Sequence, residues 1–394
     1  FMSSDWSSDV CSSDLVKEWL HYCGRCNSCK YIYRDYRECC PAYTKFYFEP
    51  YTSGGKIWMA LDLYQKKYEW SESIVQKIYT CTLCGNCTVQ CQQEAGEHAL
   101  DIFEALREEA VEKGLGPLKA HRHFQEEINQ EDNPYGEPKD ERFANLSRKY
   151  FNTDADVIYF VGCTSAYREK ELIQSVIPIL EKLDIKFTLI EDEVCCGSPL
   201  ITTGQKKAAK RLAKHNVDII NKMNGKTVIA SCAGCLRTLK SQYKKKYNLE
   251  INKEIIHFSE LLARHLKDLK HIYSDHVKKD EIATYHDPCH IGRHIGIYEE
   301  PRKVLESIPG INLIEMGRIR ENAWCCGAGA GVKSGIKDWA VEISEERIKE
   351  AKKTGAQYLV STCPFCERNL RDAAEKLNSG IEVIDLSQLV LRKI

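Results

Sequence analysis

Two adjacent cysteines followed by a glycine occur twice in this chain, at Cys195–Cys196 and at Cys325–Cys326. Adjacent cysteines make a poor disulfide, because a bridge between neighbours forces a strained ring. A tight turn can instead present both thiolates to one metal centre, and the following glycine lets the backbone bend and approach that centre closely. The cysteines around each pair decide between these two interpretations.

Each pair belongs to a repeat in the C-terminal half of the chain. Both repeats have the form C-x(31–35)-CC-x(35–36)-C-x-x-C, and equivalent cysteines lie 126, 130 and 131 residues apart. Apolar segments such as DVIYFVGC end at cysteines, and amphipathic segments such as ELIQSVIPILEKL lie between them. Strands that alternate with helices predict parallel α/β units, where ligands bind beyond the carboxyl ends of the strands. Because every cysteine group follows a predicted strand, we expect the five cysteines of a repeat to converge at one sheet edge.

The N-terminal cysteines form two runs. The second is a full C-x2-C-x2-C-x3-C run, and the first has the same three initial cysteines but a delayed fourth, where Cys39 and Cys40 compete. We prefer Cys40 because proline follows it, as in ferredoxins, where the fourth cysteine of each run ligates the other run's [4Fe–4S] cubane. A zinc site built from CxxC pairs is the alternative. The predicted cubane ligands are Cys23, Cys26, Cys29 and Cys91 for one cluster, and Cys81, Cys84, Cys87 and Cys40 for the other.

These patterns divide the chain into parts. Residues 1–15 are Ser/Asp-rich without any period, and we interpret them, with Cys11, as a disordered tail or a sequencing artefact. Residues 16–150 are expected to form a helical, ferredoxin-like domain with two cubanes, whose polar end at 129–142 reads as a linker. Residues 151–272 and 273–394 are expected to form the two α/β repeat domains.

Charge and hydropathy limit the partners. Lys and Arg number 56 and Asp and Glu number 57, so no basic excess points to nucleic acid. No apolar run approaches the ~18–20 residues of a membrane span, so another subunit would have to hold the chain at a membrane. The 20 cysteines stand in a long, Lys/Glu-rich sequence without a signal-peptide pattern. This favours metal ligation in a reducing, cytoplasmic compartment over disulfides.

Each five-cysteine repeat resembles the CCG (cysteine-rich) domain of heterodisulfide reductases. Two such domains behind a double-cubane domain resemble the D subunit of the membrane-linked enzyme, over nearly the whole chain after residue 16. The resemblance implies that each complete motif binds a noncubane [4Fe–4S] cluster through five thiolates, which would explain the paired cysteines. The implied ligands are Cys163, Cys195, Cys196, Cys232 and Cys235 for the first cluster, and Cys289, Cys325, Cys326, Cys363 and Cys366 for the second.

The resemblance also implies a function. The cubanes would relay electrons to the two noncubane clusters, which reduce a disulfide of the coenzyme M–coenzyme B type. The implied partner is a membrane b-type cytochrome or a flavoprotein. The alternative is an electron-transfer subunit of an FAD-linked glycolate, lactate or glycerol-3-phosphate dehydrogenase, which passes electrons to quinone or another carrier. A third class is a zinc-binding interaction protein.

Other residues near the second repeat's cysteines admit two interpretations each. His286, His290 and His294 surround Cys289, and they either donate protons or only hydrogen-bond cluster sulfur and cap the next helix. Arg293 either holds an anionic substrate group or is a solvated arginine. The GAGAG segment after the second cysteine pair fits a close backbone approach to a cluster better than a nucleotide loop. The lysine-rich KSQYKKKY segment is expected to be a solvated helix face, or else to bind an acidic partner.

Overall fold

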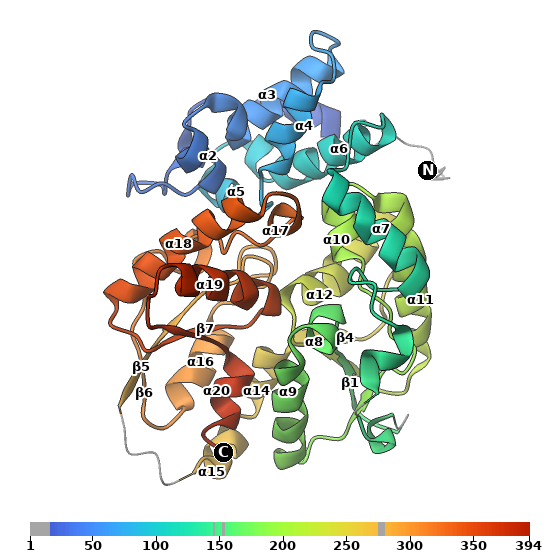
Figure 1. Cartoon of the computed structure of the whole chain (residues 1–394), viewed down its shortest axis with the longest axis vertical. Coiled ribbons are helices and arrows are strands. Elements are labelled where there is room, and N and C mark those ends of the chain that lie inside the picture. Colours follow the sequence, from blue (N-terminus) through green and yellow to red (C-terminus); the bar gives the residue numbers. More distant parts are fainter. Residues whose placement is uncertain (1–15, 145, 152–153, 275–279) are drawn as a thin grey trace, which may run out of the picture.

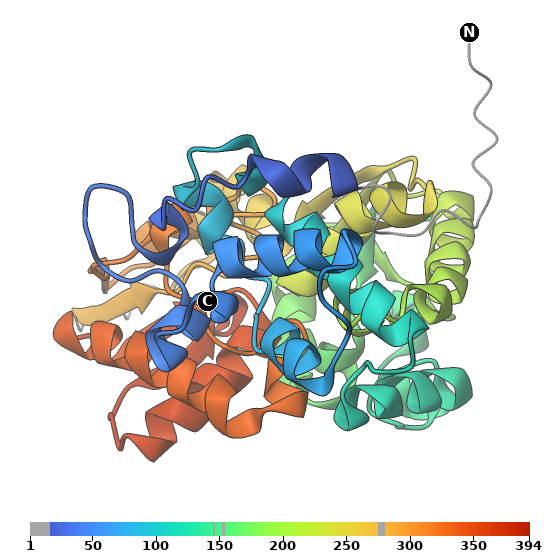
Figure 2. The same cartoon turned by 90° about the horizontal axis from the view of Figure 1, so that it is seen from above.

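The computed structural model describes residues 16–144, 146–151, 154–274 and 280–394. The predicted tail at 1–15, including Cys11, lies outside these residues. Figure 1 shows the N-terminal helices, in blue, lying across one end of two α/β domains that stand side by side, and Figure 2 views the same arrangement from above. The predicted fold class, a helical dicluster domain followed by two repeated α/β domains, is therefore confirmed.

The helical domain consists of short helices around a small apolar core. Its two longest core helices are α3 and α6, and Leu20, Ile57 and Phe103 are buried between its elements. Thr52 begins α3 by accepting a hydrogen bond from Gly55 N at 2.9 Å, as an N-cap residue does. The elements are η1 (Lys17–Tyr22), η2 (Ser28–Lys30), α2 (Pro41–Phe46), η3 (Glu49–Tyr51), α3 (Ser53–Tyr64), α4 (Glu72–Tyr79), α5 (Asn86–Gln90), η4 (Glu94–Gly96) and α6 (Ala99–Glu112).

The first α/β domain contains a four-stranded parallel sheet in the order β2-β1-β3-β4. All four residues of β1 are buried, as expected for a parallel strand that is covered on both faces. Its strands are β1 (Val157–Phe160), β2 (Phe187–Leu189), β3 (Thr227–Ala230) and β4 (Glu254–His257). Its helices are α8 (Cys163–Tyr167), α9 (Lys170–Lys182), α10 (Ser198–Thr202), α11 (Lys206–Lys222), α12 (Ala233–Arg237), the π-helical η7 (Thr238–Gln242), α13 (Tyr243–Tyr247), α14 (Phe258–Arg264) and α15 (Leu266–Ile272).

The second α/β domain repeats this topology in the order β6-β5-β7-β8, again with parallel strands. Its strands are β5 (Glu281–Tyr285), β6 (Ile311–Leu313), β7 (Tyr358–Ser361) and β8 (Glu382–Asp385). Its helices are α16 (Glu299–Ser307), η8 (Arg320–Asn322), α17 (Val332–Gly335), α18 (Lys337–Lys353), α19 (Pro364–Lys376) and α20 (Leu386–Leu391).

The two α/β domains pack through equivalent helices. Helix α9 of the first domain lies against α20 of the second, and α14 of the first lies against α16 of the second. Helices α14 and α20 both follow the last strand of their sheets, and α9 and α16 both follow the first. The two contacts are therefore related by an approximate two-fold axis. At one of them, Ser175 Oγ and Ser387 Oγ lie 2.6 Å apart. This packing turns the carboxyl ends of both sheets toward each other.

The predicted linker differs from expectation. Helix α7 (Lys119–Glu131) runs into it, and η5 (Lys139–Phe143) and η6 (Arg148–Tyr150) follow. Ile128 of α7 belongs to the buried core of the α/β domains, and Asp132 O accepts a hydrogen bond from Cys195 N at 2.9 Å. The polar residues of this segment therefore form its solvent-facing side, and its few apolar residues pack against the first α/β domain.

Candidate metal centres

Eight cysteines of the helical domain line two cavities, which we name the outer and the inner cavity. In each cavity the fourth thiol comes from the other run of cysteines, because η2 and α5 pack against each other and bring the two runs together. Their role as cubane ligands stays a prediction. The outer cavity is lined by Cys23, Cys26, Cys29 and Cys91, and the inner cavity by Cys40, Cys81, Cys84 and Cys87.

Cys39 and Cys40 have different surroundings. Cys40 lines the inner cavity and forms the N-cap of α2, whose first residue is Pro41. Cys39 is completely buried, is not among the residues that line either cavity, and donates its thiol to Cys29 O at 3.4 Å. The proline fixes the helix start, so the chain presents Cys40 to the cavity and turns Cys39 into the protein.

The five thiols of the first repeat lie together, and we call them the first thiol group. They follow β1, β2 and β3 and form a continuous series of contacts among buried, unbridged cysteines. Hydrogen bonds from Cys195 and Cys235 lower the pKa of Cys196, and hydrogen bonds from Cys235 and Cys363 lower the pKa of Cys232. In order of contact the series is Cys163, Cys195, Cys196, Cys235 and Cys232.

The five thiols of the second repeat, the second thiol group, form the same series. Hydrogen bonds from Cys325 and Cys366 lower the pKa of Cys326, as those from Cys195 and Cys235 do for Cys196 in the first group. The same order in both repeats follows from the same topology, since each series joins the ends of three neighbouring parallel strands. In order of contact the series is Cys289, Cys325, Cys326, Cys366 and Cys363.

The thiol groups also meet one another. Cys232 of the first group and Cys363 of the second are in hydrogen-bonding contact. Cys325 of the second group is in the same kind of contact with Cys84 of the inner cavity. The inner cavity is therefore connected to the second thiol group, and the second thiol group to the first, while Ser53 lines both the inner and the outer cavity.

One expectation about position is wrong. Cys325 and Cys326 do not directly follow a strand, since β6 ends at Leu313 and residues 314–324 intervene. That segment is held by buried polar contacts, in which Arg302 pairs with Asp287 at 2.7 Å and with Glu315 at 2.5 Å. These pairs return the chain to the sheet edge, so the cysteines still reach their group.

Three cations without carboxylate partners surround the inner cavity, within the described part of the chain. Lys56 is buried and donates to Thr52 O at 3.5 Å and to Tyr51 O. The other two are Arg107 and Arg293, which donate their hydrogen bonds to main-chain carbonyls. Buried charges need opposite charges, so this region is built for an anionic group with thiolate ligands.

The number of thiols in each group and the main-chain amides beside them also fit iron–sulfur clusters. Thiolates are soft donors that suit both zinc and iron–sulfur clusters, but five thiols in one group exceed the four ligands of a tetrahedral zinc site. Main-chain amides also point at sulfur, because Gly197 N and Gly327 N donate to Cys195 Sγ and Cys325 Sγ at 3.3 Å each. The GAGAG segment thus approaches sulfur as the sequence suggests.

A glycine is required beside the first group. Gly162 has φ of +78°, and a Cβ atom there would lie 2.9 Å from Cys235 Sγ. Any side chain would therefore both strain the backbone and press on the thiol.

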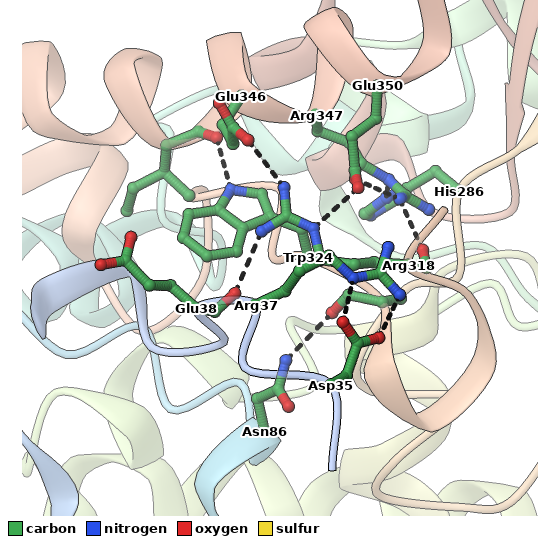
Figure 3. A network of polar contacts seen from close by, with 12 residues as sticks. Asp35, Arg37, Glu38, Asn86, His286, Arg318, Trp324, Glu346, Arg347 and Glu350 are labelled. Atoms are coloured by element: carbon green, nitrogen blue, oxygen red, sulfur yellow. Dashed lines mark hydrogen bonds and ion pairs between the residues drawn. The ribbon is translucent and has the colours of Figure 1, made fainter. Parts of the chain in front are cut away.

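His286 is fixed by a buried arginine. Arg347 Nε donates to His286 Nδ1 at 3.1 Å, so a neutral ring carries its proton on Nε2. Figure 3 shows Arg347 between His286 and Glu350, with Arg318 beside Trp324. A ring nitrogen of His286 lies within 4.8 Å of the sulfur atoms of Cys326 and Cys366. The side chain therefore fits a hydrogen-bond donor to sulfur better than a proton donor to substrate.

The other predicted residues lie on the more open side. His290 and His294 are partly exposed and stand with ring centroids 4.9 Å apart. Burial, with Arg237 nearby, lowers the pKa of His290 to about 3. Arg293 is not a free anion receptor, because its Nε donates to Cys84 O at 2.7 Å and its Nη1 donates to Ala323 O at 2.7 Å.

Sequence reasoning missed a buried arginine at the first thiol group. Arg142 comes from the predicted linker, and its Nη1 and Nη2 lie 3.7 and 3.8 Å from Cys163 Sγ. It also pairs with Glu193, which accepts hydrogen bonds from Val161 N and Gly162 N at 2.7 and 2.8 Å. The sequence around Arg142 is polar throughout, so it does not show that this arginine is buried while its neighbours are solvated.

The lysine-rich segment is also different from its expected form. Lys246 is nearly buried and pairs with Glu104 at 2.8 Å and Glu108 at 3.0 Å, both on α6. Lys245 pairs with Asp101 of the same helix at 2.6 Å. Lys245 and Lys246 therefore bind an acidic face within their own chain, while the side chains of Lys244 and Lys245 stay largely exposed as expected.

Comparison with known proteins identifies the family. The cysteine-rich CCG domain matches residues 157–240 and 283–371, and the 4Fe-4S dicluster domain matches residues 19–95. The D subunit of the dihydromethanophenazine:CoB–CoM heterodisulfide reductase of Methanosarcina acetivorans is 41% identical over 82% of this chain and 79% of the relative. The chain belongs to the family of heterodisulfide reductase D subunits. The protein of the same name from Methanosarcina barkeri is 42% identical over 81% of this chain and 78% of the relative.

More distant relatives of this D-subunit family member have other names. FadF, a probable iron-sulfur-binding oxidoreductase of Bacillus subtilis, is 25% identical over 81% of this chain and 47% of the relative. The EtfAB:quinone oxidoreductase of Syntrophomonas wolfei is 27% identical over 80% and 46%. A hypothetical protein from Helicobacter pylori shares the fold in a crystal structure, with a TM-score of 0.56 and 11% identity over 88% of this chain and 68% of that one.

Membership in the D-subunit family settles the coarse assignment. The chain is an iron–sulfur electron-transfer subunit related to the D subunit of heterodisulfide reductase, and its cysteine-rich domains indicate iron–sulfur clusters. The zinc-binding interaction protein considered above is therefore set aside. Among the helices that the structure describes, we find none with the length and apolar character to cross a membrane.

Proposed function

We propose that this chain is the disulfide-reducing subunit of a heterodisulfide reductase complex, acting on a disulfide of the coenzyme M–coenzyme B type. In this proposal each cavity holds a cubane [4Fe–4S] cluster and each thiol group holds a noncubane [4Fe–4S] cluster. Such clusters would supply the one-electron steps that a two-electron reduction needs. The names of the two Methanosarcina relatives support the choice of substrate.

The contact between Cys232 and Cys363 carries the proposal. It brings two complete five-thiol groups together at one point. Reduction of a disulfide breaks its S–S bond and leaves one thiol on each half, so a thiol group on each side of the bond can receive one half each. An added Cβ on Gly234 would lie 3.7 Å from Cys232 Sγ, His290 Nδ1 and Ser198 Oγ, so polar side chains of both α/β domains border this contact.

The proton supply is part of the proposal. Reduction of one disulfide consumes two electrons and two protons and yields two thiols. His290 and His294 remain the predicted donors, because they are the partly exposed imidazoles near the contact. Since burial lowers the pKa of both rings, each would relay protons from solvent instead of storing one. His286 is completely enclosed and hydrogen-bonded to Arg347 through Nδ1, so we assign it to holding sulfur.

A second candidate is an electron-transfer subunit without its own substrate. The similarity to FadF and to an EtfAB:quinone oxidoreductase favours it, because the name of the second relative places quinone as the acceptor. In that case the connected thiol groups would pass electrons from a flavoprotein to a quinone or another carrier. Completeness of both thiol groups supports the disulfide reductase over this candidate.

The proposed complex has at least one further subunit. We propose that a b-type cytochrome in the membrane or a flavoprotein delivers electrons to the outer cavity, whose Cys26 is exposed. This partner would also hold the chain at the inner face of the membrane.

Electron paramagnetic resonance on anaerobically purified protein tests the function. Four [4Fe–4S] clusters imply about 16 iron per chain, which iron and sulfide analysis measures. The protein is oxidised in the presence of coenzyme M, coenzyme B or an unrelated thiol such as glutathione. A new paramagnetic signal with coenzyme M or coenzyme B alone supports the disulfide reductase. Full iron content with no thiol-dependent signal supports the electron-transfer subunit.

A further inference from the structure

Among the residues that the structure describes, the loop with the inner cysteines contacts the second α/β domain, and not the first, through its thiols. Cys84 of this loop is in hydrogen-bonding contact with Cys325 of the second domain. Around this contact the loop and the second domain share further hydrogen bonds on both sides. These run from Trp339 Nε1 to Thr80 O (3.3 Å), from Cys325 Sγ to Thr82 Oγ1 (3.4 Å) and from Asn86 Nδ2 to Ala323 O (3.3 Å).

Arg293 joins the two chain segments on either side of the Cys84–Cys325 contact. Its Nε donates to Cys84 O at 2.7 Å, and its Nη1 donates to Ala323 O at 2.7 Å and to Glu321 O at 3.2 Å. The planar guanidinium holds these donors in a fixed fork. One side chain therefore sets the position of a cysteine of the inner cavity relative to a cysteine of the second thiol group.

The first α/β domain has no equivalent of this arginine. Counting from the first cysteine of each repeat, Tyr167 takes the place of Arg293. Tyr167 Oη donates to Pro138 O at 3.3 Å, so it faces the segment after α7. The adjacent pair of the first repeat also faces that segment, since Cys195 N donates to Asp132 O at 2.9 Å. The two repeats thus have equivalent thiol groups but different neighbours.

We propose that Arg293 is the positioning residue that couples the inner cavity to the second thiol group. Electrons then reach the second thiol group first, and the first thiol group receives them across the Cys232–Cys363 contact. Each transfer oxidises the donor site by one electron and reduces the acceptor site by one electron, and no bond or proton moves. The inference rests on the cluster sites of the proposed function, and it concerns the order of transfer within the chain.

The variants Arg293→Met and Arg293→Lys test the role of this side chain. The methionine removes both the charge and the fork, whereas the lysine keeps the charge and removes the fork. Arg264→Met is the matched control, because Arg264 is exposed and pairs with Glu254 on the outer part of the first domain. The purified proteins are mixed with dithionite without any disulfide, and freeze-quench paramagnetic resonance follows reduction of each kind of site. Iron content and the midpoint potential of the cubane signals are measured in parallel.

We expect full iron content in all three variants. Reduction of the noncubane sites should slow by about tenfold or more in Arg293→Met and Arg293→Lys, since a small misplacement is enough for such a loss. The midpoint potential should fall in Arg293→Met and stay unchanged in Arg293→Lys. A wild-type rate in a fully loaded Arg293→Met protein overturns the proposal. If Arg293→Met loses iron, the test uses Arg293→Lys instead, and a wild-type rate of noncubane-site reduction in that variant overturns the proposal.

A matched pair of cysteine variants tests the order of transfer. Cys163 and Cys289 are the first cysteines of their repeats, and serine at either position should remove one noncubane signal. We expect the second site to be reduced at the wild-type rate in Cys163→Ser, and the first site to be reduced about tenfold more slowly, or not at all, in Cys289→Ser. The reverse pattern overturns the order. Turnover of the disulfide substrate is assayed separately. If the wild-type protein does not reduce the disulfide although dithionite reduces all of its cluster sites, the result contradicts the proposed function and leaves the order of transfer untouched.

Discussion

Cys232 and Cys363 touch across the boundary between the two α/β domains, and each is the N-cap residue of the helix that follows it. The contact arises because α9 packs on α20 and α14 packs on α16, so that the two domains are related by an approximate two-fold axis. Equivalent positions of the two repeats are thereby brought face to face. The chain thus builds one composite centre from two copies of one motif.

Cys40 and Cys39 provide the sharpest test of the inner cavity. Cys40→Ser removes a thiol that lines this cavity, and we expect loss of about four iron per chain, the content of one cubane. Cys39→Ser changes a thiol that only donates to Cys29 O, and the iron content should stay at the wild-type value. Iron analysis of the two matched variants decides, and the opposite pattern would reverse the assignment.

Arg107 should support both stability and redox potential. It is fully buried, and its Nη1 donates to Thr202 O at 2.6 Å and to Ala330 O at 2.9 Å, one carbonyl from each α/β domain. Its Nη2 donates to Cys81 O at 2.5 Å. Arg107→Met should lower the free energy of unfolding by about 3 kcal/mol or more, because several buried carbonyls lose their donor.

The same variant should lower the midpoint potential of the inner cubane, because a positive charge beside an anionic site is removed. Arg122→Met, on the exposed face of α7, is the control and should change neither quantity. Anaerobic denaturation and a paramagnetic redox titration measure the two effects. An unchanged potential in a fully loaded Arg107→Met protein would contradict the electrostatic role.

His121 should make stability depend on pH. It is buried, and its Nε2 lies 2.8 Å from Gly331 O. Burial lowers its pKa to about 4 from 6.5, and Arg107 contributes in the same direction. The folded pKa is below the unfolded one, so the unfolded chain binds the proton first. The stability from this residue is present above pH 6.5 and is lost as the pH falls toward 4.

Between pH 7.5 and 5.5 we expect His121 to account for a loss of about 1 kcal/mol in the free energy of unfolding. His121→Gln keeps a donor for Gly331 O and does not titrate, so this part of the pH dependence should disappear. Anaerobic denaturant titrations at the two pH values measure the difference between wild type and variant. An identical change with pH in both proteins would show that His121 is not responsible.

Neighbouring lysines of the KKK run should differ in importance. Lys246 lies nearly buried between Glu104 and Glu108, so Lys246→Met should cost about 3 kcal/mol by removing a cation from between two buried carboxylates. Lys245 has a side chain 54% exposed, and Lys245→Met should cost less than about 1 kcal/mol. A Glu104→Gln, Lys246→Met double variant should lose less stability than the sum of the single variants. Equal costs for the two lysines would contradict the buried network.

Local sequence patterns predicted the elements well. The apolar spacing of HALDIFEALREEAVEKG corresponds to α6 (Ala99–Glu112), and ELIQSVIPILEKL corresponds to α9 (Lys170–Lys182). The strands before Cys163, Cys232, Cys289 and Cys363 were equally visible, because parallel strands are nearly all apolar. The prediction of a strand directly before Cys325 was wrong, since residues 314–324 contain only the short η8 and are held by ion pairs that leave no periodic signal.

The spacing of the cysteines is enough to predict which of them share a centre, because the predicted ligands recur at fixed short intervals and the whole pattern is duplicated. Which thiol groups are neighbours, and what surrounds them, depends on long-range packing. The contact of Cys84 with Cys325 and the roles of Arg142, Arg293 and Lys246 depend on partners far away in the sequence. A charged residue looks the same in a sequence whether water or a buried partner balances its charge, and folding alone settles which of the two is present.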